Sequence, residues 1–317
     1  GPAMKEESLY EKLISEMPLR GEITLKVAKL KLPTSHEVSE IFLKISKEEK
    51  LFKVEAPEIK LCNLNFYAEY EKNPKFQYLF VDLKPAQGDL LDLFSCLYPE
   101  EMPRIIFEGP FRLQGFFYTD GEKTLLENSY GKIEVTSKNG YMYRAPLIAR
   151  VLGFLSPIDL FRGKIPNLEN NLLPYEEMDL LGEFRDTSFN LESFFLSASG
   201  FRMFGTGPIS LKDKSLELTF LVSPFKTLDI ILENIPFFNK WILGKERMFI
   251  YIPIEVVGTY ENPTIFPLHP ASIGKGLFRF IFKFFGIQED FFKKPENFEK
   301  FKKQELLKGK SENSLRR

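Results

Sequence analysis

The chain contains two histidines, His36 and His269. Histidine is the side chain best suited to proton transfer and metal binding near neutral pH. They lie far apart in the sequence, and His269 stands in a proline-flanked loop. The chain has no Cys-x-x-Cys, His-Glu-x-x-His or calcium-loop spacing. The sequence therefore predicts no metal site and no cofactor, and both histidines are expected to be exposed.

A glycine-rich stretch, Gly200 to Gly207, is the nearest approach to a phosphate-binding loop. It lacks the lysine and following serine or threonine that such a loop needs, so its glycines are expected to mark bends in strands. No Gly-x-Ser-x-Gly nucleophile elbow is present. With 44 Asp and Glu residues, carboxylate pairs arise by chance. The chain is predicted to have no catalytic residues and not to be an enzyme. A carbohydrate-active β-enzyme, with carboxylates clustered in a cleft, is kept as a third hypothesis.

The composition is rich in phenylalanine, with 33 Phe against one Trp, which indicates either an aromatic core or a surface that faces an apolar ligand. The net charge of −1 argues against nucleic acid as a partner. No uncharged run of about 18 apolar residues exists, so no membrane-spanning helix is predicted. Cys62 and Cys96 either pair in an oxidising compartment or are small buried apolar side chains.

Apolar and polar residues alternate along several segments, as in half-buried strands. The strands expected on this ground are 23–27, 62–70, 107–117, 216–222 and 248–256, with Asp120-Gly121 and Asn139-Gly140 as turns between strands. Helical periodicity predicts helices at 5–17, 89–97, 144–155 and 227–242. The expected fold is mainly β with a few short helices.

A weak internal repeat divides the chain. Segments that start near Pro85 and Pro224 both read strand, proline, short apolar helix and long strand, at an offset of about 140 residues. The predicted units are 5–124 and 125–270. Residues 1–4, Gly-Pro-Ala-Met, are taken as an expression-tag scar.

Residues 271–317 differ from the rest of the chain. Lys275, Arg279 and Lys283 fall on one side of a predicted helix, and Phe278, Phe282 and Phe285 fall on another. This basic amphipathic helix either lies in a membrane interface or packs on the end of the sheet. The tail beyond it is predicted to be solvated.

A family resemblance is carried by the region from about 125 to 270, which contains RVLGFLSPIDLF, GEFRDTSFNL, GTGPISLKDKSLELTFLVSP and VVGTYENP. It resembles the C-terminal region of the AsmA-like superfamily and is most similar to its YhdP branch. The positions that match are Gly182, Phe184, Gly205, Gly207, Pro224, Gly258, Thr259 and Pro263.

The resemblance implies a long, twisted antiparallel sheet, curled into a half-open groove that is apolar inside. Such proteins are thought to conduct phospholipid between the inner and outer membranes, so a periplasmic location is expected. They are anchored in the inner membrane by an N-terminal helix, which is not in this sequence. The expected partners are phospholipid acyl chains, a membrane surface through the C-terminal helix, and an envelope protein.

The predicted groove wall consists of apolar residues on one face of each strand. They are Phe107, Phe111, Leu113, Phe117, Leu218, Phe220, Ile250, Ile252 and Ile254. The alternative is a structural or interaction scaffold for envelope assembly, in which the same units close over a dry core.

Overall fold

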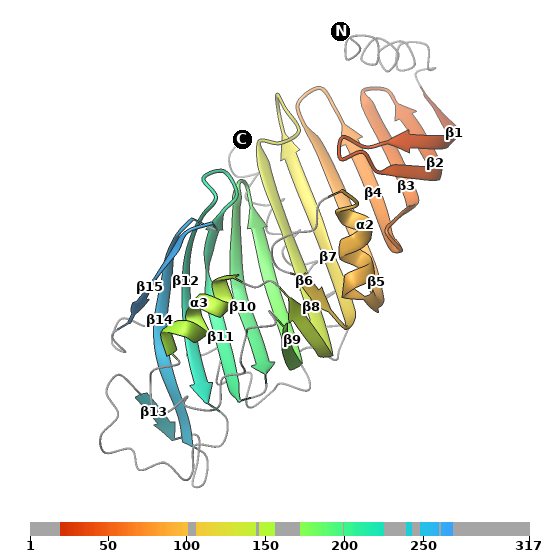
Figure 1. Ribbon diagram of the computed structural model, residues 1–317. Helices are drawn as coiled ribbons and strands as arrows, with labels where there is room; N and C mark the ends of the chain where they lie inside the picture. Colours follow the sequence, from red (N-terminus) through yellow and green to blue (C-terminus); the bar gives the residue numbers. More distant parts are fainter. Residues whose placement is uncertain are drawn as a thin grey trace. The chain divides into compact units, whose positions relative to one another are not determined.

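The computed structural model describes residues 20–100, 106–143, 146–155, 172–198, 200–224, 239–242, 248–259 and 261–268. Within them the protein is one large antiparallel sheet with two short helices, which confirms the mainly β fold class. The strand order is β1-β2-β3-β4-β5-β7-β8-β9-β10-β11-β12-β14-β13, with β6 beside β8 and β15 beside β14. The order ends at β1 and β13, so the sheet is not closed. The strands are labelled in Figure 1.

The chain divides into two compact units. Unit 1 comprises Gly1–Ala86 and Gly115–Gly131, and unit 2 comprises Gln87–Gln114 and Lys132–Arg317. The two predicted repeat units meet at residue 124, in the turn between β7 and β8, and their relation as copies stays a prediction.

Unit 1 contains strands but no helix among its described residues. Its strands are β1 (Arg20–Lys31), β2 (Glu37–Glu48), β3 (Leu51–Leu61), β4 (Leu64–Lys72) and β5 (Gln77–Asp89) up to Ala86, with the end of β7 (Pro110–Gly121) and the start of β8 (Asn128–Tyr143). The predicted strands at 23–27 and 62–70 are confirmed as β1 and β4, although Cys62 lies in the turn before β4 with a φ of 51°.

Unit 2 contains both helices, α2 (Leu90–Leu97) and α3 (Pro146–Leu155). Its strands are β6 (Ile106–Glu108), β9 (Leu172–Arg185), β10 (Ser188–Ala198), β11 (Phe201–Ser210), β12 (Ser215–Pro224), β13 (Asn239–Ile242), β14 (Met248–Thr259) and β15 (Pro263–Pro267), with the remainder of β5, β7 and β8. The predicted strands at 216–222 and 248–256 are confirmed as β12 and β14.

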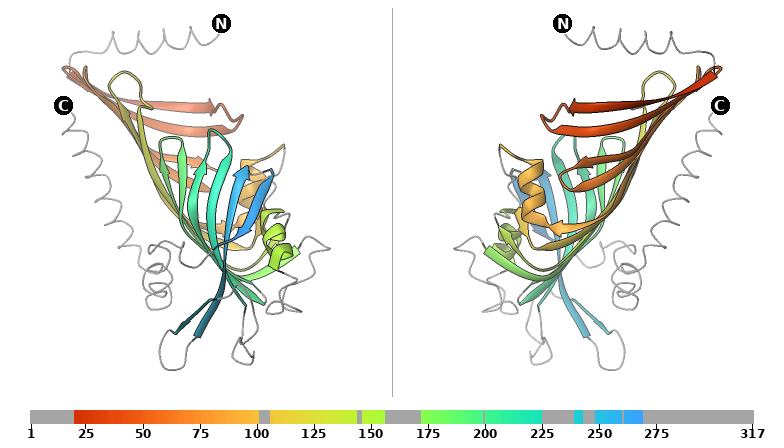
Figure 2. Two further views of the ribbon diagram at one scale, coloured as in Figure 1. Left: turned by 90° about the vertical axis from the view of Figure 1, so that its left-hand side faces the viewer. Right: turned by 90° about the vertical axis from the view of Figure 1, so that its right-hand side faces the viewer.

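The two predicted helices that the structure describes are confirmed. Asp89 caps α2, because its side chain accepts a hydrogen bond from the Leu91 amide at 2.9 Å. Helix α3 lies against β15 (Figure 2), where Arg150 donates to the carbonyl of Pro263 at 2.9 Å. Leu155, at the end of α3, is fully buried.

Four expectations about secondary structure were wrong. Asp120-Gly121 is not the turn itself but the end of β7, and the turn follows at 122–127. The run 107–117 is not one strand, because Gly109, with a φ of 140°, separates β6 from β7. Asn139-Gly140 is not a turn between strands but lies inside β8, where a Cβ on Gly140 would come within 2.3 Å of the Tyr175 hydroxyl. The end of the helix expected at 227–242 is strand β13, and 227–238 lie outside the described residues.

The cysteines do not behave as buried apolar side chains. Cys96 is exposed, Cys62 is half-buried, and both are disulfide-bonded. The prediction that they are buried was wrong. Cys62 lies in the turn between β3 and β4, and Cys96 lies near the end of the short helix α2.

Candidate lipid-facing surface

One face of unit 1 is apolar and open. Cross-strand register puts apolar side chains opposite one another from β1 to β5. The pairs are Ile23 with Ile45, Leu25 with Leu43, Ile45 with Val54, Val54 with Tyr70, Ala68 with Val81, and Tyr70 with Leu79. We call this set, with Ile41 and Ala56, the open apolar face.

The open apolar face is thinly covered. Ile23 is 46% exposed and Leu25 is 42% exposed, and the buried cluster of β1–β4 consists of Val38, Ile41 and Ala56. Full burial of a large apolar side chain contributes about 1.5–3 kcal/mol. Ile23 and Leu25 are only partly buried, so they contribute less than this to the stability of the protein. A ligand with an apolar surface would gain from covering this face.

The opposite face carries polar side chains on β3–β5, whereas on β2 the same face also presents Phe42, which is 50% exposed and lies opposite Lys26. Lys53 contacts Glu55 at 2.9 Å and Glu69 at 3.5 Å, while Tyr67 and Tyr78 donate to Glu69 at 2.9 and 2.5 Å. Partial burial opposes ionisation of Glu69, but the hydrogen bonds from Tyr78 and Tyr67 and the charge of Lys53 outweigh it and lower its pKa. The two faces of unit 1 thus differ in polarity on β3–β5, where these carboxylates, the lysine and the tyrosine hydroxyls lie.

The predicted wall residues of β12 and β14 share one face of unit 2. Register pairs Leu218 with Val256, Phe220 with Ile254, and Val222 with Ile252. All of them are buried: Leu218 is 3% exposed, Phe220 4%, Ile252 1% and Ile254 not at all. An acyl chain could contact these residues only by displacing what covers them. The side chain of Ile250 lies outside the described ones.

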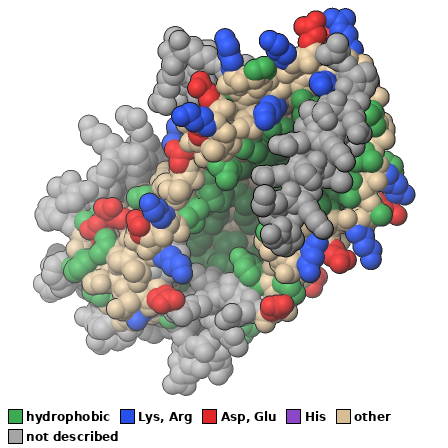
Figure 3. Space-filling view, turned by 90° about the horizontal axis from the view of Figure 1, so that it is seen from above, with side chains coloured by type: hydrophobic (Ala, Val, Ile, Leu, Met, Phe, Trp, Pro, Cys, Tyr) green, Lys and Arg blue, Asp and Glu red, His purple; other side chains and the backbone are tan. Residues whose placement is uncertain are grey.

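The other predicted wall residues lie in two units. Phe111 and Leu113 belong to unit 2 and are buried, and Phe107 is half-buried with its ring 6.2 Å from the ring of Tyr175. Phe117 belongs to unit 1 and is half-buried beside Gly131. Figure 3 shows hydrophobic side chains gathered on one face, with charged side chains around them.

Strands β10–β12 bury side chains on both faces, which alternation did not predict. Phe194, Phe195 and Leu196 are consecutive and all buried. On the face opposite to Phe220, the rings of Phe195 and Phe204 are 4.9 Å apart, and both are buried. This part of unit 2 therefore resembles a packed core more than one open wall.

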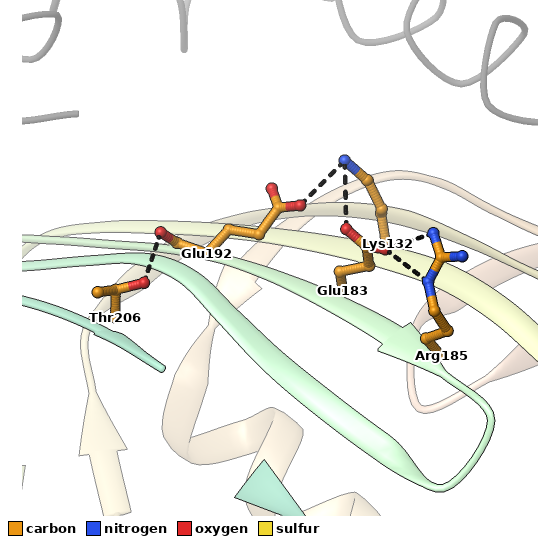
Figure 4. Close-up of polar contacts among 5 residues, drawn as sticks. All are labelled: Lys132, Glu183, Arg185, Glu192 and Thr206. Carbon is orange, nitrogen blue, oxygen red and sulfur yellow. Dashed lines mark hydrogen bonds and ion pairs between the residues drawn. The ribbon is translucent and has the colours of Figure 1, made fainter. Parts of the chain in front are cut away.

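A buried ion cluster on β8, β9 and β10 was also missed (Figure 4). The Lys132 ammonium, whose side chain is 3% exposed, lies 3.3 Å from Glu192 and 4.0 Å from Glu183, and Arg185 contacts Glu183 at 3.1 Å. Thr206 donates to the backbone carbonyl of Glu192 at 3.2 Å. The sequence signal was the interruption of apolar runs by Glu183 and Glu192.

The pKa values of the two carboxyls of this cluster are shifted in opposite directions. Burial and the neighbouring Glu183 raise the pKa of Glu192. Burial also opposes ionisation of Glu183. Hydrogen bonds to Glu192 and Arg185, together with the positive charges of Lys132 and Arg185, outweigh burial and lower the pKa of Glu183. The Lys132 side chain is almost fully buried, and its ion pairs join β8 to β9 and β10.

A further carboxyl, Asp179 on β9, is 5% exposed, and its Oδ2 atom has no hydrogen-bond partner. Burial, followed by the hydrogen bond and charge of Glu177, raises the pKa of Asp179 to about 8. Among the described residues, no group of three or more His, Cys, Asp or Glu side chains is arranged to hold a metal ion.

Several predicted features fall outside the described residues. They are the helix at 5–17 and the amphipathic helix with Lys275, Phe278, Arg279, Phe282, Lys283 and Phe285. No helix within the described ranges is both long and apolar enough to cross a membrane.

Comparison of the chain with protein-family models, curated proteins and solved structures gave no match. The AsmA-like assignment therefore remains a prediction that rests on the residue pattern in 125–270.

Proposed function

We propose that this protein is a non-catalytic lipid-binding module, whose open apolar face receives the acyl chains of phospholipids. The observation that carries this proposal is the exposure of Ile23 and Leu25 on a face that is apolar from β1 to β5. Each CH₂ group that leaves water contributes about 0.8 kcal/mol, so even a partly covered acyl chain binds with useful affinity.

We further propose that the protein carries phospholipid between the inner and outer membranes of a bacterial envelope and is anchored at the inner membrane. This proposal rests on the resemblance to the AsmA-like superfamily. The two disulfide-bonded cysteines support an oxidising compartment such as the periplasm, because disulfides persist there and are rare in the cytoplasm. A membrane surface and an envelope protein are the further partners proposed.

The test compares two substitutions at neighbouring, half-buried positions of β2. Ile45→Glu places a carboxylate on the open apolar face, whereas Ser46→Glu places the same charge on the polar face. Native mass spectrometry of protein purified from cells, with uptake of a fluorescent phospholipid, should show lipid on the wild type and on Ser46→Glu. Ile45→Glu should lose it while keeping the wild-type circular dichroism spectrum. Equal lipid binding by the two variants, or none by the wild type, would reject the proposal.

A scaffold with a dry core is the second candidate, favoured by the burial of Ile252 and Ile254 in unit 2. It predicts that Ile252→Asp unfolds the protein instead of only blocking lipid uptake, because an unpaired charge would be buried. A folded Ile252→Asp variant without lipid would instead make Ile252 part of a lipid-contacting wall.

A further inference from the structure

Among the described residues, strand β1 forms one edge of the sheet. It is 12 residues long and pairs with β2 on one side, and no described strand pairs with its other side. The outward N–H and C=O groups of such a strand are a template for another strand.

The opposite end of the strand order is protected. The outer side of β14 pairs with β13, of four residues, and with β15, of five residues, which begins and ends with proline. Short strands and prolines are common ways to prevent edge-to-edge pairing. Strand β1 is longer and contains no proline, and the charges that could limit its pairing are those of Arg20, Glu22, Lys26, Lys29 and Lys31.

The side chains of β1 divide by face. Ile23 and Leu25 belong to the open apolar face, and Glu22, Thr24 and Lys26 lie on the polar face, all of them exposed. The Lys26 ammonium lies 5.6 Å from the centre of the Phe42 ring on β2, which keeps it close to the sheet surface.

We propose that β1 pairs antiparallel with β1 of a second copy of this chain, about a two-fold axis through Thr24. In this register Glu22 lies opposite the partner's Lys26, and Ile23 lies opposite the partner's Leu25, and each pair occurs twice. The open apolar face then continues across both copies. The inference is independent of the proposed function.

This register is selected by two properties of the β1 side chains: their charges, and the face of the sheet on which each of them lies. When a two-fold axis normal to the sheet passes through a residue of β1, residues that lie opposite each other across the interface belong to the same face. A shift of the register by one residue would place apolar side chains opposite polar ones. Centring the axis on Leu25 puts Glu22 opposite Ala28. Centring it on Lys26 puts two lysines opposite each other, and centring it on Ile23 puts Arg20 opposite Lys26. Only Thr24 among these centres gives complementary charges.

The test is a charge swap followed by sedimentation velocity over a range of protein concentrations. The wild type should show a reversible monomer–dimer equilibrium. Glu22→Lys and Lys26→Glu should each weaken the dimer by about tenfold or more, because each converts two attractive pairs into two repulsive ones. The double variant, and an equimolar mixture of the two single variants, should both dimerise like the wild type. Lys75→Glu, in the β4–β5 turn, controls for net charge.

A protein that stays monomeric at all concentrations overturns the proposal, as does a dimer that neither single variant weakens. Failure of the mixed single variants to form a heterodimer overturns the register. Circular dichroism of each variant separates loss of pairing from loss of folding. Lipid uptake tested through Ile45→Glu does not depend on these outcomes, so either idea can fail alone.

Discussion

Gly205 on β11 lies directly opposite Phe220 on β12, and the Phe220 ring covers the space where a side chain at 205 would be. A Cβ added to Gly205 would lie 2.5 Å from Cε1 and 2.6 Å from Cδ1 of that ring. Phe220 is 4% exposed, so its ring has little free space into which it could turn. Aromatic side chains laid over glycines are a known way to fix strand register.

We therefore expect Gly205→Ala to destabilise the protein by about 1–3 kcal/mol, the usual cost of an added methyl group in a packed core. At about 2–4 °C per kcal/mol for a domain of this size, the melting temperature should fall by roughly 2–12 °C. Phe220→Leu in the same chain should recover part of the loss, because the shorter side chain leaves room for the new methyl group.

Thermal unfolding followed by circular dichroism is the assay, and Gly153→Ala is the matched control. A Cβ at Gly153 meets nothing within 4 Å, and alanine in a helix is favoured over glycine by about 1 kcal/mol, so this variant should melt at or above the wild-type temperature. A Gly205→Ala protein as stable as the wild type would show that Phe220 moves freely. Phe220 would then belong to an open wall and not to a core.

Three further predictions concern buried charge and the cysteines. The pKa of Asp179 is raised to about 8 in the folded protein, so its contribution to stability is fully present below about pH 4, the ordinary aspartate value, and is lost as the pH rises to about 8; the melting temperature of Asp179→Asn relative to the wild type should therefore rise between about pH 4 and pH 8, and parallel melting curves would contradict this. Lys132→Met should cost about 3 kcal/mol or more in urea unfolding, whereas Arg185→Met, at an exposed pair, should stay within about 0.5 kcal/mol; equal costs would contradict the burial argument. Iodoacetamide should modify Cys62 and Cys96 in the denatured protein only after reduction, as mass spectrometry of unreduced and reduced samples would show.

Alternation predicted those strands whose two faces differ. The apolar residues of β1, β12 and β14 recur at every second position, and the structure pairs them in that phase. Helix α2 could be predicted equally well, because Asp89, a residue type that commonly caps helices, precedes a short run whose apolar residues lie on one side of a helix. These signals are local, so the sequence alone is sufficient for them.

The rest of the surface depends on pairing between distant segments. The run from Phe194 to Leu196 has no period of two, and all three side chains are nevertheless buried. The association of Lys132 with Glu192 requires the register of three strands, and nothing in the spacing of these residues indicates it. The same holds for the covering of the β12 and β14 wall, because alternation alone does not distinguish a lined groove from a packed core; the open groove was predicted from the family resemblance.

The strand order has a consequence for how the chain folds and varies. From β1 to β12 the order in the sheet follows the order in the chain, except for the short β6, so most strands find their partner in the next segment to emerge. Loop closure between such neighbours costs little entropy, which favours folding that proceeds hairpin by hairpin during synthesis. Such a sheet can also lengthen or shorten by whole hairpins, because removal of one pair of strands leaves the next two antiparallel strands able to meet.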